Sequence, residues 1–155
     1  MAHKLVVLEW LYKADEDFGF AKLSLPDAKN YFNQICFHFQ QAAKKYLKAY
    51  IVKSGLKFEK EHDLVKLLKI CAIHDSSLAT LEEDCRFLNP FYFEIRYPDQ
   101  VFAVCTRDQA EEAYKRVDEI RNLIKKKIGI DREITLEEVG KESRKVDRIL
   151  KEGKI

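Results

Sequence analysis

A row of polar side chains at helical spacing is the first feature of this sequence that suggests chemistry. Residues three and four apart lie on one face of a helix, and a run of amides, a histidine and lysines keeps that spacing. Lysine ammonium groups bind phosphate as point charges, and the imidazole and amides beside them can line a groove. The row is either such an anion-binding groove or the solvated face of an amphipathic helix. Its members are Gln34, His38, Gln41, Lys45 and Lys48.

Two further segments combine groups that bind phosphates or bases. Arg96 and Tyr97 follow aromatic residues at 91–93, so the guanidinium can pair with a phosphate while the rings stack on a base. The alternative is that the rings fill the core and Arg96 satisfies nearby carbonyl or carboxylate oxygens. His62 precedes Asp63, a residue type that caps helices. His62 is therefore either a ligand residue or a loop residue beside that cap.

Several common site chemistries are absent from the sequence. It contains no Gly-rich phosphate loop, nucleophile elbow or dinucleotide fingerprint. His3 and His74 lack the neighbours of a metal-ligand set, so we expect no metal site and no cofactor. The cysteines form no Cys-x-x-Cys pair and each lies beside apolar residues, which predicts buried reduced thiols. They are Cys36, Cys71, Cys85 and Cys105.

Apolar periodicity predicts an all-α protein, an antiparallel up-and-down bundle of four to five helices with an appended C-terminal helix. The chain has only 5 Gly and 3 Pro, which favours long elements and few turns. Two adjacent apolar stripes at 27–54 indicate that this segment is the central helix. The expected helices are residues 4–23, 27–54, a shorter one after Asp63, one at 76–88 and one after Thr106.

Capping and breaking residues mark the ends of these helices. We expect Asp27 to cap the second helix and Gly55 to end it in a left-handed conformation. Pro90 is expected to kink or end the fourth helix near Leu88. Only the run at 101–104 suggests extended backbone. Pairs with the spacing of a capping box are Thr80–Glu83, as an alternative start of the fourth helix, Thr106–Gln109 and Thr135–Glu138.

Composition and the C-terminal segment suggest the domain organisation. With 155 residues, 46% apolar and 35% charged, the chain suits one globular domain plus an appended element. We expect a bundle over residues 1–130 and a charged helical extension over 131–155. The narrow apolar seam of this extension, from Leu136 to Leu150, needs a partner on its own bundle or on another chain.

Charge and hydropathy restrict the partners of the protein. The formal net charge of +2 gives no global attraction to nucleic acid, although a local basic face remains possible. There is no run of roughly 18 to 20 apolar residues, and the N-terminus begins a charged amphipathic segment instead of a signal peptide. We therefore expect a cytoplasmic protein without a membrane partner.

Three segments, taken together, are similar to a known family. They are the run from Phe37 to Ala49, the group His62-Asp63-Leu64 with Leu67-Leu68, and Arg96-Tyr97-Pro98-Asp99. In order and spacing, over about Leu5 to Lys127, they resemble the HEPN domain (higher eukaryotes and prokaryotes nucleotide-binding). One departure is Lys44, where the family commonly has Glu, and this lysine adds positive charge to the helix.

The resemblance implies both an assembly and a set of ligand residues. HEPN bundles often form homodimers, and in prokaryotes they are often encoded beside a minimal nucleotidyltransferase, as a toxin-antitoxin pair or a two-component unit. The family's ligand residues are carried over onto Gln41, Lys45, Lys48, His62 and Arg96. Together with His38 and Tyr97 from the patterns above, these are the candidate residues for binding a nucleotide or an RNA phosphate.

The order of the arginines and histidines bears on catalysis. Many HEPN relatives are ribonucleases whose hallmark is an Arg followed roughly four to six residues later by a His, the His acting as general acid or base and the Arg stabilising phosphate charge. Here the last histidine, His74, precedes the first arginine, Arg86. The hallmark is therefore absent, so we assign no catalytic residue and expect a protein that is not an enzyme on its own.

Three functions stay open at this point. The leading hypothesis is a HEPN binding module, a homodimer that binds nucleotide or RNA phosphate and partners a minimal nucleotidyltransferase. The alternative is a metal-independent ribonuclease toxin with a displaced catalytic histidine, His38 or His62, supplied by another helix or subunit. The third is an assembly protein whose charged tail docks a partner.

Overall fold

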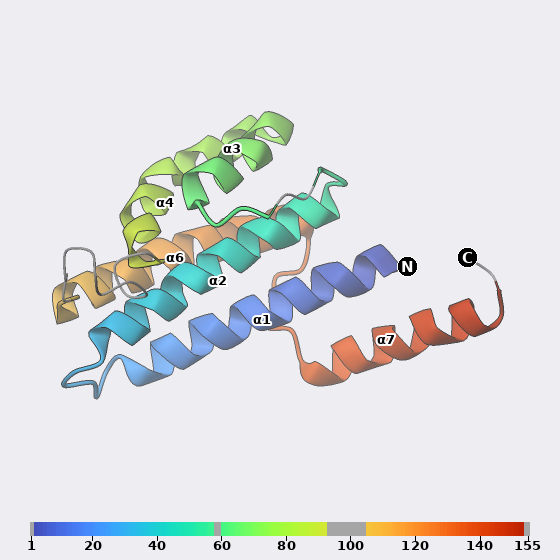
Figure 1. Ribbon diagram of the computed structural model, residues 1–155, viewed down its shortest axis with the longest axis horizontal. Helices are drawn as coiled ribbons and strands as arrows, with labels where there is room; N and C mark the ends of the chain where they lie inside the picture. The colour runs from blue at the N-terminus through green and yellow to red at the C-terminus, as the bar shows by residue number, and fades with distance from the viewer. Residues whose placement is uncertain (1, 58–59, 93–104, 154–155) are drawn as a thin grey trace.

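The computed structural model describes residues 2–57, 60–92 and 105–153, and every regular element among them is helical. This confirms the expected fold class, a bundle of antiparallel helices with an appended C-terminal helix (Figure 1). No helix among the described residues is both long and apolar enough to cross a membrane. The elements are α1 (Ala2–Ser24), α2 (Phe32–Lys53), α3 (Leu64–His74), the 3₁₀ helix η1 (Ser76–Leu81), α4 (Glu82–Leu88), the 3₁₀ helix η2 (Asn89–Tyr92), α6 (Arg107–Ile128) and α7 (Leu136–Lys151).

Helix α2 is the central helix, as its two apolar stripes predict. It packs on α1 and α6 and also meets α3, α4 and η2, and Figure 1 shows it in the middle of the bundle. Phe39, Tyr46 and Leu47 are fully buried, and each such side chain contributes about 1.5–3 kcal/mol by leaving water. Gly55 follows the helix with φ of 66°, the left-handed conformation expected at its end.

The turn between α1 and α2 is longer than the sequence predicts. Helix α2 begins at Phe32, and the residue before it, Tyr31, has no side-chain cap hydrogen bond, so the expectation that Asp27 caps this helix is wrong. The Arg107 guanidinium donates to the carbonyl oxygens of Leu25, at 3.3 Å, and Ala28. The Leu25 carbonyl oxygen also accepts from the Ala28 amide at 3.2 Å, so a turn held by Arg107 reverses the chain before α2 starts.

The region between α3 and η2 follows the predicted caps only in part. Asp63 caps α3 by accepting from the amides of Val65 at 2.9 Å and Lys66 at 3.2 Å. The helix expected at 76–88 is divided into η1 and α4, and Asp75 caps η1. Thr80 forms no capping box, because its hydroxyl donates to the Ser77 carbonyl oxygen instead. The break at Pro90 is confirmed, since α4 ends at Leu88.

The cysteines differ from the expectation of four reduced thiols. Cys36 on α2 and Cys105, just before α6, form a disulfide. Their separation of 69 residues hides this proximity from a sequence reading. Cys71 and Cys85 are buried free thiols, and burial raises the pKa of each to about 12. Residues 101–104, expected to be extended, lie outside the described residues.

Helix α7 packs on α1 of its own chain. The capping boxes Thr106–Gln109 and Thr135–Glu138 both form at the starts of α6 and α7. Val146 and Glu142 of α7 are buried, and the Glu142 carboxylate lies 3.6 Å from the Lys4 ammonium group on α1. Leu136 and Leu150, which belong to the predicted seam, are exposed. The seam is therefore covered in its middle and open at both ends.

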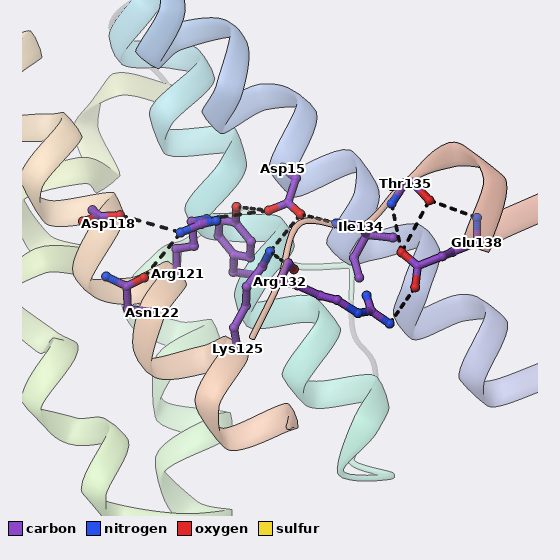
Figure 2. A network of polar contacts seen from close by, with 10 residues as sticks. Asp15, Asp118, Arg121, Asn122, Lys125, Arg132, Ile134, Thr135 and Glu138 are labelled. Atoms are coloured by element: carbon purple, nitrogen blue, oxygen red, sulfur yellow. Dashed lines mark hydrogen bonds and ion pairs between the residues drawn. The ribbon is translucent and has the colours of Figure 1, made fainter. Parts of the chain in front are cut away.

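A buried carboxylate joins α1, α2, α6 and the segment that leads to α7 (Figure 2). Asp15 accepts from the Tyr46 hydroxyl at 2.6 Å, the Lys125 ammonium group at 2.8 Å and the Ile134 amide at 3.0 Å. Lys125 also donates to the Arg132 carbonyl oxygen at 2.7 Å. Burial lowers the pKa of Lys125, and Asp15 opposes that shift. Burial and the nearby Asp15 carboxylate both raise the pKa of Tyr46.

Candidate functional site

The polar row on α2 faces a carboxylate of α1. Asp17 receives His38 and Lys45 on its two oxygens, with 2.9 Å from the His38 Nδ1 to Oδ1 and 2.5 Å from the Lys45 Nζ to Oδ2. The structure thus brings two of the candidate residues together through a residue that sequence reasoning missed. The available signal was that Asp17 lies beside Phe18, at the edge of the apolar stripe of α1.

Gln41 of the row connects a buried lysine to a buried amide through hydrogen bonds. The Lys44 ammonium group donates to the Gln41 Oε1 at 2.7 Å, and the Gln41 Nε2 donates to the Gln40 Oε1 at 2.8 Å. Gln40 is 0% exposed, yet its Nε2 has no hydrogen-bond partner among the described residues. A buried polar atom without a partner costs about 1–3 kcal/mol. Such an atom indicates a group that a ligand or a water satisfies.

Lys48 is the most deeply placed lysine of the row. It is 5% exposed, and its Nζ lies 5.4 Å from the centre of the Trp10 ring on α1. Burial lowers the pKa of Lys48, the Glu61 carboxylate raises it, and the charge of Lys45 lowers it further. The effect of the Glu61 carboxylate on this pKa shows that Glu61, in the segment before α3, lies close enough to act on Lys48.

His62 reaches the same region from the segment before α3. Its ring stacks on Tyr92 with the centroids 5.1 Å apart and the planes at 10°, and the Lys44 Nζ lies 5.8 Å from the centre of the Tyr92 ring. The His62 Nδ1 is buried without a hydrogen-bond partner among the described residues. Burial lowers the pKa of His62, and the charges of Lys44 and Lys48 lower it further.

These residues form one electropositive site, which we call the lysine face. The two nitrogens without partners belong to an amide and an imidazole, which can both donate. The charges of Lys44 and Lys48 act on the imidazole, and Lys44 is linked to the amide through Gln41. Asp17, paired with Lys45, and Glu61 partly balance the charge, and backbone N–H groups of Asp63 and His62 lower the pKa of Glu61. Donors gathered around positive charge suit an anion. The lysine face consists of Gln40, Gln41, Lys44, Lys45, Lys48 and His62.

Two candidate residues are not placed by the structure. Arg96 and Tyr97 lie outside the described residues, so their relation to the lysine face stays a prediction. Among the described residues there is no group of three or more His, Cys, Asp or Glu side chains that could hold a metal ion.

The helical bundle and its basic central helix define a class of protein, and comparison with known proteins identifies that class. Residues 7–128 match the HEPN domain family, so the chain belongs to the HEPN family. Helix α7 lies beyond the matched residues. This match confirms the predicted resemblance to the HEPN family.

Two solved structures are similar to this chain. TT1696 from Thermus thermophilus is 28% identical with a TM-score of 0.68, over 78% of this chain and 97% of its own. ST0689, an archaeal HEPN homologue, is 25% identical with a TM-score of 0.64, over 79% of this chain and 97% of its own. Among curated proteins none matches this chain.

Proposed function

We propose that this protein is a HEPN binding module that holds the phosphate of a nucleotide or an RNA at the lysine face. The observation that carries the proposal is the pair of buried nitrogens without partners among the described residues, the Gln40 Nε2 and the His62 Nδ1, beside lysines that lower the pKa of His62. A bound phosphate supplies acceptor oxygens to these two nitrogens when the side chains that bury them move aside. It also supplies the negative charge that offsets the crowded ammonium groups.

The energetics of the lysines favour an anionic ligand. Lys44 and Lys48 are four residues apart on α2, a spacing at which like charges repel on a helix. Both are buried, at 8% and 5% exposure, so water screens their attraction for an anion only weakly. A hydrogen bond to a charged group contributes about 1.5–3 kcal/mol. Two or three such bonds contribute about 3–9 kcal/mol in total before the cost of association.

The proposed assembly follows from the family. The resemblance to HEPN domains supports a homodimer with a nucleotidyltransferase encoded nearby as partner, in a toxin-antitoxin-like or two-component unit, and we infer a cytoplasmic location. In this proposal residues 1–130 form the binding bundle and residues 131–155 an extension that packs on it. No catalytic residue, metal or cofactor is assigned to the chain on its own.

Calorimetric titration with pyrophosphate, ADP and a single-stranded RNA tests the proposal. The variant Lys48→Met removes the charge and keeps an apolar chain against Trp10. We expect it to weaken binding about tenfold or more, because a charge-assisted hydrogen bond is lost. The matched control is Lys69→Met, on an exposed residue of α3. Equal binding by wild type and Lys48→Met, or no binding of any of the three ligands with or without the neighbouring nucleotidyltransferase, would contradict the proposal.

One observation favours the ribonuclease alternative. The Asp17 carboxylate contacts the Nδ1 of His38 at 2.9 Å, and a carboxylate in this position orients an imidazole so that its Nε2 can act as a base. RNA degradation by the purified protein tests this function. Activity lost in both His38→Ala and Asp17→Asn, and kept in His3→Ala, supports it. Activity that is insensitive to His38→Ala and His62→Ala refutes it.

A further inference from the structure

A second site lies at the turn between α1 and α2. Here the surface forms an open pocket of about 730 Å³, which is within the usual range for small-molecule sites. Its walls combine aromatic and aliphatic side chains with a carboxylate and amides. This is the chemistry that receives a planar base, since the rings stack on its faces and the polar groups bond its edges. The lining includes Phe20, Leu23, Tyr31, Ile35, Asp27 and Gln34.

Tyr31 lines this pocket, and its backbone adopts a strained conformation. It is the one described non-glycine residue with positive φ, at 65°. This left-handed conformation favours glycine or asparagine over a residue with a bulky side chain. The strain places a 74% exposed aromatic side chain in the lining of the pocket. Neither the turn nor the helix start requires a tyrosine, because its side chain makes no cap hydrogen bond.

The pocket and the lysine face are continuous. Gln34 lines the pocket and belongs to the same helical row as Lys48. Phe20, 55% exposed in the pocket wall, has its ring 4.9 Å from the ring of His38. His38 in turn shares the Asp17 carboxylate with Lys45. An unbroken line of side chains therefore leads from the pocket to the lysines.

The separation of the two sites decides the size of the ligand. Gln34 and Lys48 are 14 residues apart on α2, which is about 21 Å at 1.5 Å per residue. A single nucleotide holds its base and phosphate too close together to reach both sites. A stacked strand rises about 3.4 Å per nucleotide, so about six nucleotides span the distance.

We propose that the pocket at the α1–α2 turn is a nucleobase-binding site for the unpaired end of a single-stranded oligonucleotide whose backbone follows α2 to the lysine face. The inference rests on the proposed function, because the lysine face holds the phosphates. It adds a site and a minimum ligand length. Tyr31 is the residue on which the terminal base stacks.

The test is fluorescence anisotropy with labelled single strands of three, six and nine nucleotides, as RNA and as DNA. We expect affinity to rise from three to six nucleotides and then to level off. Tyr31→Asn is expected to weaken binding of the six-nucleotide strand at least about fivefold, because a stacked base is lost, and to raise the Tm by roughly 2–4 °C, because the strain is relieved. Tyr31→Phe keeps the ring and is expected to keep the affinity. Comparing the RNA strands with the DNA strands shows whether the sugar of the strand affects affinity.

The two proposals fail in different ways. If pyrophosphate binds wild type and Tyr31→Asn equally while the six-nucleotide strand also binds both equally, the base-binding site is overturned and the lysine face stands. If pyrophosphate does not bind but the strand binds in a Tyr31-dependent way, the pocket stands and the phosphate site is overturned. A Tm of Tyr31→Asn at or above that of wild type shows that a loss of binding is not due to misfolding.

Discussion

Replacing Asp15 with alanine should strongly destabilise this protein, because one carboxylate accepts from three separate elements. The donors are the Tyr46 hydroxyl, the Lys125 ammonium group and the Ile134 amide. Without the carboxylate, the Lys125 charge stays buried with the Arg132 carbonyl oxygen as an acceptor, and the hydroxyl and the amide lose this acceptor. Breaking a buried ion pair by removing one partner costs about 3–5 kcal/mol.

The size of this effect can be compared with two related variants. A domain of this length loses roughly 2–4 °C of Tm per kcal/mol, so Asp15→Ala is expected to lower the Tm by roughly 6–20 °C. Lys125→Met removes the cation and leaves Asp15 with two donors, so its cost should be smaller, about 1–3 kcal/mol. The double variant, Asp15→Ala with Lys125→Met, removes both members of the buried ion pair. Its cost should therefore fall short of the sum of the single costs by at least about 1 kcal/mol.

Urea denaturation followed by Trp10 fluorescence and helical circular dichroism measures these differences. The control is Glu137→Ala, which breaks an exposed pair with Lys141 at 3.3 Å and is expected to cost less than about 0.5 kcal/mol. The reasoning is refuted if Asp15→Ala costs no more than this control. It is also refuted if the costs of Asp15→Ala and Lys125→Met add without coupling.

Three further predictions concern the cysteines, acid stability and the C-terminal segment. Alkylation of the denatured protein, purified without reductant, should label two thiols, Cys71 and Cys85, before reduction and four after it; four before reduction would contradict the disulfide. Hydrogen bonds, first from Ser77, lower the pKa of Asp75 to about 2. Because this folded pKa is below the unfolded one, the stability that Asp75 contributes is present above about pH 4 and lost towards pH 2. Urea titrations at pH 7, 4 and 2.5 should show this loss in wild type and a reduced loss in Asp75→Asn; equal losses would contradict it. Deleting residues 131–155 should lower the Tm and leave the number of chains per particle, measured by light scattering, unchanged, because α7 packs on its own chain; fewer chains per particle would show that the segment joins two chains.

Much of the fold could be predicted from local patterns. Apolar spacing identified α2 as the central helix, and Asp63 and Gly55 marked helix ends, because capping and left-handed turns depend on residues close in sequence. The start of α2 could not be predicted in this way. It depends on Arg107, whose guanidinium bonds carbonyl oxygens 79 and 82 residues earlier in the chain. The disulfide of Cys36 was missed for the same reason.

The candidate site was predicted along α2 and at His62. Helical spacing placed His38, Lys45 and Lys48 on one face, and the structure agrees. The partner of the first two, Asp17, comes from another helix, and the burial of Lys48 depends on packing against α1. A helical pattern cannot show that a lysine row is buried instead of solvated, because exposure is decided by neighbouring helices. The pocket near Tyr31 depends on backbone conformation and left no sequence signal.

The most direct test of the lysine face is an NMR titration of the His62 ring against pH, with and without saturating pyrophosphate. In the unbound protein, burial and the charges of Lys44 and Lys48 lower the pKa of His62. A bound anion offsets those charges and accepts a hydrogen bond from the ring, so the pKa of His62 should rise. A His62 pKa that is the same with and without saturating pyrophosphate would contradict an anion site at the lysine face.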